Sequence, residues 1–162
     1  MTPLYVKDVV TPEVARYLTS VLRMKYALGQ RAVEGTTDTQ CPTAKVSTRN
    51  EPFLDVLLEK AWPFIEELIG EELIPTYAYA RLYGNGDELE KHIDREACEV
   101  SMTVQLGRSH HYAWPIYMGG VRYDLAEGEG VIYPGCDVEH WRNKCDGPEG
   151  YYSGQVFLHY VR

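Results

Sequence analysis

The sequence predicts an α+β fold class, mostly β, in which N-terminal helices precede a double-stranded β-helix, the cupin-like jelly roll. Within residues 1–70, two segments have apolar residues at helical spacing. After residue 75, about eight short segments alternate polar and apolar residues, and turns rich in Gly and Pro separate them. Two facing antiparallel sheets that enclose a cavity accommodate such a series of short strands.

The first helix is expected to begin at Thr11, after a short strand at residues 4–6. Thr11 suits the N-cap, and Pro12 suits the first helical position because its fixed φ is already helical. Apolar residues such as Leu18 then recur on one face, and Gly29 marks the end of the helix.

A polar stretch at residues 30–48 is expected to form a loop with short extended pieces. One hypothesis is that this loop acts as a lid over a pocket. The second helix is expected from Asn50, with Pro52 in its first turn, to Gly70. Pro63 lies inside this helical pattern and is predicted to kink or break it, because proline donates no hydrogen bond.

The periodicity changes to two after Pro75, where polar and aromatic residues alternate with small and apolar ones. This alternation is typical of strands, whose side chains point to opposite faces in turn. The strands are expected at residues 76–83, 88–93, 98–106, 113–118, 121–125, 130–133, 138–143 and 151–161. Residues 1–70 would then supply supporting helices and a loop, and residues 75–162 the core, within one domain of 162 residues.

Composition narrows the class of function. Acidic residues outnumber basic ones by 24 to 16, so the net charge is −8 and binding to nucleic acid through phosphate neutralisation is disfavoured. No apolar run approaches the roughly 20 residues that cross a membrane. The four cysteines include no C-x-x-C pair, and the N-terminus does not resemble a signal peptide, so reduced thiols and a cytoplasmic location are expected.

The most informative motif is His92-Ile93-Asp94, followed by the distant His140. His92 and Asp94 are two residues apart, so in an extended segment they point to the same side. Two imidazoles and one carboxylate can occupy one face of an octahedral metal and leave three positions open, which is the arrangement of non-haem Fe(II) oxygenases. These three residues are therefore the candidate metal ligands and catalytic residues.

Three segments resemble the 2-oxoglutarate- and Fe(II)-dependent oxygenases of the prolyl-hydroxylase-like group. They are the run RLYGNGDELEKHID at residues 81–94, the run GEGVIYPG at residues 128–135 that precedes His140, and the run QVFLHY at residues 155–160. The resemblance covers roughly residues 75–162. It implies that His92, Asp94 and His140 hold Fe(II), that 2-oxoglutarate chelates the metal, and that dioxygen takes the last position.

The chain departs from the family at the residue that would bind the distal carboxylate of 2-oxoglutarate. The family usually places a Lys or Arg on the last long strand, about nine to ten residues after the second His. Here those positions are Glu149 and Gly150, or Ser153 when the last strand is aligned from its end. None of these residues is a cation.

Arg142 is the first candidate for a substitute anchor, because it lies two residues beyond His140 and shares its face if the strand is extended. A surface Arg paired with a carboxylate is the competing interpretation. Arg81, on the strand before His92, is the second candidate. Further candidate contacts to the cosubstrate come from Tyr83, Ser153 and Gln155.

The leading hypothesis is a dioxygenase that hydroxylates a peptidyl residue, such as proline, or a small molecule, and releases succinate and CO2. The alternative is a non-catalytic, cupin-like metal-binding or sensory module. The sequence leaves the substrate, the oxidised carbon and the oligomeric state open. His159 on the last strand is expected to be a hydrogen-bonded residue of the core or pocket wall, and Arg95 either orients Asp94, binds a substrate carboxylate or lies exposed in a turn.

Overall fold

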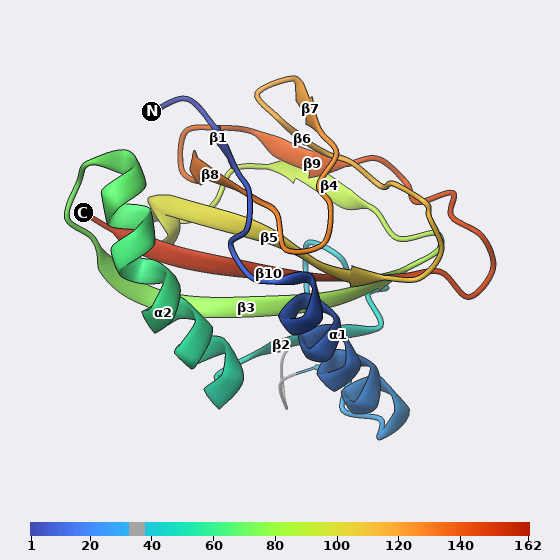
Figure 1. The fold of residues 1–162 in the computed structure, drawn as a ribbon. Coiled ribbons are helices and arrows are strands. Elements are labelled where there is room, and N and C mark those ends of the chain that lie inside the picture. The colour runs from blue at the N-terminus through green and yellow to red at the C-terminus, as the bar shows by residue number, and fades with distance from the viewer. Residues whose placement is uncertain (33–37) are drawn as a thin grey trace.

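A computed structural model describes residues 1–32 and 38–162. In these residues the chain forms two antiparallel sheets that face one another, with both α-helices on the outer side of the larger sheet (Figure 1). The mostly β architecture with N-terminal helices is therefore as predicted. No helix in the described part of the chain is long and apolar enough to cross a membrane.

The larger sheet has six strands in the order β1-β8-β5-β10-β3-β2. Three long strands form its centre, because the last strand of the chain lies between β3 and β5 and pairs with both along most of its length. The strands are β1 (Leu4–Val6), β2 (Val46–Arg49), β3 (Ile74–Gly84), β5 (Val100–Arg108), β8 (Gly130–Pro134) and β10 (Tyr152–Val161).

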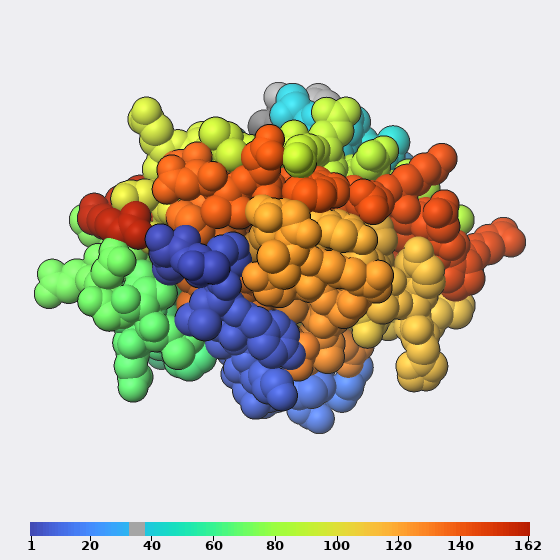
Figure 2. All heavy atoms as spheres, turned by 90° about the horizontal axis from the view of Figure 1, so that it is seen from above, coloured from blue at the N-terminus to red at the C-terminus, as the bar shows by residue number. Residues whose placement is uncertain are grey.

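The smaller sheet has four strands in the order β4-β9-β6-β7. Its members are β4 (Leu89–His92), β6 (Ile116–Met118), β7 (Val121–Tyr123) and β9 (His140–Arg142). Seen from above, the orange region that contains β6, β7 and β9 of this sheet faces the viewer, and the N-terminal segment in blue lies beside it (Figure 2). Strands β4 and β9 are neighbours, so the two halves of the H-x-D…H motif meet across one pair of strands.

Helix α1 (Pro12–Ala27) begins as the sequence predicts, with the Thr11 hydroxyl accepting a hydrogen bond from the backbone N–H of Val14. Helix α2 (Pro52–Ile69) has Glu51 rather than Asn50 at its N-cap position, without a side-chain cap hydrogen bond, and Gly70 ends it in the left-handed conformation. The helix continues through Pro63, so the predicted break is absent. Packing of its apolar face on the sheet stabilises the turn that proline weakens.

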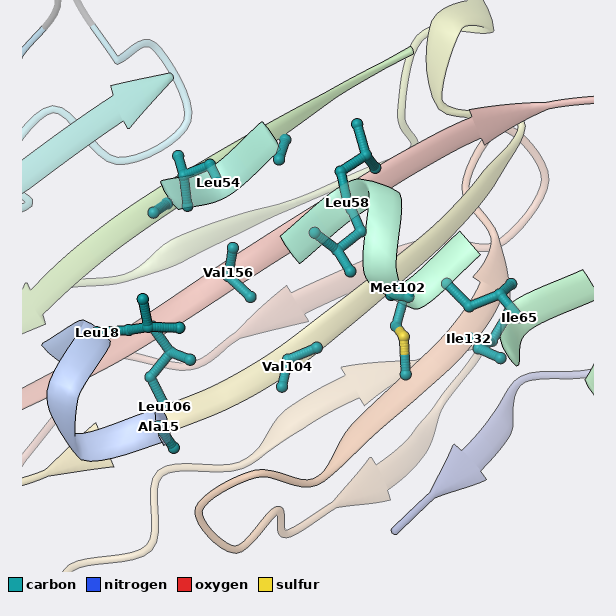
Figure 3. Packing of buried hydrophobic residues seen from close by; sticks show 14 of the residues in the cluster. Ala15, Leu18, Leu54, Leu58, Ile65, Met102, Val104, Leu106, Ile132 and Val156 are labelled. Carbon is teal, nitrogen blue, oxygen red and sulfur yellow. The ribbon is translucent and has the colours of Figure 1, made fainter. Parts of the chain in front are cut away.

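The main hydrophobic core lies between the helices and the outer face of the six-stranded sheet (Figure 3). Leu18 of α1 and Leu54 of α2 pack towards Val104 and Val156 of the central strands, and Val104, Val156 and Leu54 are fully buried. Alternation along each strand sends the next residues to the opposite face. The inner face is consequently available for polar side chains that surround a pocket.

Each of the eight expected strands is present, with bounds that differ by a few residues. The largest shortenings affect residues 113–118 and 138–143, of which only Ile116–Met118 and His140–Arg142 are strands. A 3-10 helix at Glu96–Cys98 replaces the start of the strand expected at residues 98–106. Strand β2 is one of the extended pieces predicted in the loop at residues 30–48, whose residues 33–37 lie outside the described part.

Candidate metal centre

His92, Asp94 and His140 converge at one end of the space between the two sheets. His92 is the last residue of β4 and pairs directly with His140, the first residue of β9. The Asp94 Oδ1 atom lies 3.7 Å from His92 Nε2 and 3.5 Å from His140 Nε2, and the imidazole centroids are 4.2 Å apart. Three potential ligand atoms, one from each of the three candidate residues, thus lie within 4.8 Å of one another.

Both imidazoles are oriented by backbone carbonyl groups. His92 Nδ1 lies 2.7 Å from the Glu90 carbonyl oxygen, and His140 Nδ1 lies 2.9 Å from that of Val138. A carbonyl can only accept a hydrogen bond, so each neutral ring carries its proton on Nδ1 and keeps the Nε2 lone pair free. Both lone pairs belong to the nitrogens nearest to Asp94.

The local charges favour the forms that bind a metal. Burial, together with the neighbouring His140, lowers the pKa of His92, which keeps its imidazole neutral. Burial alone would raise the pKa of Asp94, but the neighbouring His140 imidazole and the hydrogen bond from the Ser101 hydroxyl outweigh it, and the pKa falls below its usual value. Neutral imidazoles and an ionised carboxylate are the states that a divalent cation requires.

The second oxygen of Asp94 is held from the opposite side. The hydroxyl of Ser101 on β5 donates to Asp94 Oδ2 at 3.0 Å, and the Tyr133 hydroxyl on β8 donates to it at 3.4 Å. The backbone N–H of Asp94 donates to the Gly135 carbonyl at 2.8 Å. One carboxylate oxygen therefore faces the imidazoles while the other is bound to the protein.

This donor set fits a transition-metal ion that also binds small ligands. Three protein donors from one side of a metal leave further coordination positions open, and two imidazoles with one carboxylate suit Fe(II). Among the described residues, a second group, Asp94, Cys98 and His159, also brings potential ligand atoms within 4.8 Å of one another. Both groups contain Asp94, so they cannot each bind a metal ion independently.

A pocket of about 350 Å³ opens beside the three residues. Aromatic side chains from the six-stranded sheet form one wall, and the segment Asp38–Gln40 forms part of another. The aromatic and charged lining includes Tyr77, Tyr79, Phe157, Arg49, Arg81 and Arg95. Gln40 and its neighbours belong to the predicted loop at residues 30–48, so the described part of that loop does border the pocket.

Arg142 occupies a closed position between the sheets. It lies two residues beyond His140 on β9, is 1% exposed, and donates through Nη1 to the Trp114 carbonyl. The Gln155 amide is best satisfied with its oxygen 3.3 Å from Arg142 Nη2. Within residues 1–32 and 38–162, Arg142 has no ion-pair partner and its Nε has no hydrogen-bond partner.

The surface interpretation of Arg142 is therefore wrong, and burial lowers its pKa. A buried guanidinium without a counter-ion is costly, because desolvation is not offset by an opposite charge.

Arg81 differs from Arg142 because it already has a carboxylate partner. Its Nε and Nη2 atoms lie 2.5 and 2.9 Å from the two oxygens of Asp38, and Nη2 also donates to Gln40 at 2.6 Å. Ser47 and Tyr79 donate to the same carboxylate at 2.6 and 3.1 Å. Sequence reasoning missed Asp38, since a single Asp in a polar loop carries no spacing signal.

The remaining candidate contacts lie deep between the sheets. Tyr83 is fully buried and accepts a hydrogen bond from Arg81 Nη1 at 3.1 Å. Ser153 accepts from Gln105 at 3.0 Å, and Gln155 lies beside Arg142. Of the five cosubstrate candidates, only Arg81 is among the described residues that line the 350 Å³ pocket.

The comparisons with known proteins identify the fold. No protein-family model matches the sequence, and no curated protein matches it. Solved structures do match: the chain has the fold found in 2-oxoglutarate- and Fe(II)-dependent oxygenases.

Three of these structures are similar over nearly the whole chain. A prolyl-4-hydroxylase from Pseudomonas putida has a TM-score of 0.66 at 15% identity, over 99% of this chain and 92% of that one. The collagen prolyl hydroxylase of Paramecium Bursaria Chlorella virus-1, in its 2OG complex, has a TM-score of 0.67 at 8% identity, over 100% and 97%. EctD from S. alaskensis has a TM-score of 0.72 at 15% identity, over 98% and 72%.

Proposed function

We propose that this protein is an Fe(II)- and 2-oxoglutarate-dependent dioxygenase that hydroxylates its substrate and releases succinate and CO2. The observation that carries the proposal is the convergence of Asp94 Oδ1 with the Nε2 atoms of His92 and His140. The two facing sheets, with these residues on β4 and β9, support a double-stranded β-helix core. The likeness to EctD structures with bound Fe and with 2-oxoglutarate supports the same pair of cofactors.

The protein residues would bind and orient the reacting groups. Fe(II) held by His92, Asp94 and His140 would supply activation of dioxygen, coupled to oxidative decarboxylation of 2-oxoglutarate. The carbonyl groups of Glu90 and Val138 fix the two imidazoles, so little reorganisation is needed when metal binds. The facing sheets would shield the metal from most of the bulk water.

Arg142 is the proposed anchor for the distal carboxylate of 2-oxoglutarate. It shares a strand with His140 at a spacing of two residues, so both side chains point between the sheets. A guanidinium binds a carboxylate through two parallel hydrogen bonds, and Arg142 has an Nε atom with no partner among the described residues. Gln155 and Tyr83 line the same region and would complete the polar surroundings of the cosubstrate.

Arg81 is the competing anchor because its guanidinium lies at the pocket itself. A carboxylate that bound there would have to replace Asp38, which several donors hold. A carboxylate that bound Arg142 would displace no protein carboxylate among the described residues. This difference makes Arg142 the better candidate, as the sequence hypothesis ranked it.

The pocket limits what the substrate can be. A volume of about 350 Å³ accommodates a small molecule or one side chain of a peptide, and lies near the low end of ligand-sized pockets. Tyr77, Tyr79 and Phe157 offer an apolar wall, whereas Arg49 and Arg95 offer positive charge at the same pocket. We propose a substrate of this size, either a peptidyl residue such as proline or a free small molecule.

The direct test is an anaerobic titration of 2-oxoglutarate into the Fe(II)-loaded protein, followed by visible absorption. We expect a weak metal-to-ligand charge-transfer band that is lost in His140→Ala. Metal binding without this band, at any concentration of 2-oxoglutarate, would favour the alternative of a non-catalytic metal-binding or sensory module. The absence of a cation at Ser153 and Gln155 on β10 is the observation that favours that alternative.

A further inference from the structure

We propose that Ser101 and His159 are positioning residues that make Asp94 a one-oxygen ligand. In this arrangement Ser101 binds Asp94 Oδ2, and His159 fixes the orientation of the Ser101 hydroxyl. Asp94 then offers only Oδ1 to the metal, which leaves one more coordination position for cosubstrate or dioxygen. The inference rests on the proposed function and assigns roles to two residues outside the metal triad.

The hydrogen-bond directions follow from the chemistry of the groups. The Ser101 hydroxyl has two groups within reach that can only accept, Asp94 Oδ2 at 3.0 Å and the Cys98 carbonyl oxygen at 3.1 Å. The carboxylate is charged and is the stronger acceptor, so Ser101 donates its single proton to Asp94 Oδ2. The Ser101 oxygen is then an acceptor towards His159 Nδ1, which lies 3.0 Å away. A neutral His159 with its proton on Nδ1 completes the chain from imidazole to hydroxyl to carboxylate.

Burial makes this series of hydrogen bonds rigid. Ser101 is 0% exposed and His159 is 5% exposed, and the two residues pair directly across β5 and β10. The Tyr77 ring lies against His159 with a centroid separation of 4.6 Å. Because both residues are on long central strands, neither can follow Asp94 if its carboxylate rotates.

Other parts of the chain lie close to the second oxygen of Asp94. A Cβ atom placed on Gly135 would lie 2.7 Å from both Asp94 Oδ2 and Ser101 Oγ, which shows how closely the chain passes this oxygen. Tyr133 also approaches Oδ2, at 3.4 Å. Three elements, β5, β8 and the turn at Gly135, therefore surround the oxygen that faces away from the imidazoles.

The test compares Ser101→Ala with Thr103→Val in the Co(II)-substituted protein. Thr103 is the next inward-facing residue of β5, is 0% exposed, and its hydroxyl contacts Gln155 at 3.4 Å instead of Asp94. Both variants remove one buried hydroxyl from the same strand. Titration with Co(II), followed by its visible absorption, measures metal affinity and the coordination of the ion without any turnover.

We expect Ser101→Ala to lower Co(II) affinity roughly 10- to 100-fold, as loss of groups that orient metal ligands typically does. Its visible spectrum should also change, and the charge-transfer band with Fe(II) should require more 2-oxoglutarate. Thr103→Val should keep the wild-type affinity and spectrum. Equal affinity and equal spectra in Ser101→Ala and the wild type would overturn the proposal.

A second pair of variants keeps the test decisive if Ser101→Ala fails to fold. His159→Asn retains a side-chain N–H near the position of Nδ1, whereas His159→Leu removes it. We expect the Asn variant to retain most of the Co(II) affinity that the Leu variant loses. Equal losses in both variants would show that His159 acts only through packing, and would overturn its positioning role.

One further outcome would contradict the proposal. A near-ultraviolet thiolate-to-cobalt band that disappears in Cys98→Ser would place the ion among Asp94, Cys98 and His159, whose ligand atoms also lie within 4.8 Å of one another. Failure of the wild type to bind Co(II) or Fe(II) at all would refute the proposed function itself. Normal binding of metal and 2-oxoglutarate by Ser101→Ala would refute only the positioning roles.

Discussion

The Asp38 carboxylate and the Arg81 guanidinium form a two-point ion pair at the pocket, with distances of 2.5 and 2.9 Å. Their side chains are only 7% and 5% exposed. A pair this deeply buried binds the segment that contains Asp38 to strand β3 and to one wall of the pocket. Removing one partner of this buried pair should therefore cost more stability than removing one partner of a surface ion pair.

Replacing Asp38 by Asn should destabilise the protein at pH 7 by about 3–5 kcal/mol, because it leaves Arg81 buried without its counter-ion. Burial raises the pKa of Asp38, but the Arg81 hydrogen bonds outweigh it and hold the pKa below its usual value. As pH falls, the unfolded state therefore binds a proton on Asp38 before the folded state does. The stability that the ion pair contributes is lost as pH falls below about 4. Urea unfolding between pH 7 and pH 3 should show the difference between the two proteins narrowing.

Asp124→Asn is the matched control for this measurement. Asp124 also pairs with an arginine, Arg122, at 2.8 Å, but the two side chains are 49% and 56% exposed. We expect this change to cost less than about 1 kcal/mol. Equal stability of Asp38→Asn and the wild type at pH 7 would contradict a structural role for the buried pair.

Replacing Arg142 by Met should weaken binding of 2-oxoglutarate at least tenfold and leave metal affinity unchanged. Loss of one buried, charge-assisted contact costs about 2–5 kcal/mol. In the absence of cosubstrate, the same variant should be as stable as the wild type or more stable, because it removes a buried charge that has no counter-ion in the described residues. Anaerobic titration and urea unfolding of the same samples measure both effects.

Arg81→Met provides the comparison, since both variants remove a buried guanidinium. It should lower stability, because Asp38 loses its partner. Loss of 2-oxoglutarate binding in Arg81→Met, with normal binding in Arg142→Met, would move the anchor to β3.

Fe(II) or Co(II) should stabilise the protein against unfolding, since the three ligands come together only in the folded state. A metal at 100 times its dissociation constant adds about 2.7 kcal/mol. Thermal unfolding with and without a chelator should show this gain in the wild type and not in His92→Ala. His111→Ala is the control, because His111 is exposed and lies outside both groups of potential ligands; loss of the gain there would point to another site.

Gly135→Ala should destabilise the protein by about 1–3 kcal/mol and reduce metal affinity together. The new Cβ would lie 2.2 Å from the Cys98 carbonyl oxygen and 2.7 Å from Asp94 Oδ2. Gly29→Ala is the control that separates the loss of stability from the loss of metal affinity. The positive φ of 75° at this position strains an alanine, but nothing lies within 4 Å of the added Cβ. Co(II) titration of both variants should show weaker binding only for Gly135→Ala, and unchanged binding there would mean that the turn can shift without moving Asp94.

Local patterns in the sequence predicted most of the elements. Thr11 and Pro12 begin α1 because capping and the fixed φ of proline depend on a few neighbouring residues. Alternation along residues 76–83 distinguishes the face with Arg81 from the face with Ala80, which packs against the helices. The break predicted at Pro63 is absent, because the packing of α2 on the sheet maintains a helix that its local sequence weakens.

The sequence by itself determined the fold class, the order of the strands along the chain and the three candidate ligands, because periodicity and the H-x-D spacing are local properties. Only the tertiary structure decided which side chains meet: Asp38 with Arg81, and Ser101 with Asp94. It also left Arg142 buried with no acid beside it among the described residues. These contacts join residues that are far apart along the chain, except for Ser101 and Asp94, which a 3-10 helix turns towards each other. The pairing between strands and the stacking of the two sheets determine these contacts, and neither produces a pattern within a single stretch of sequence.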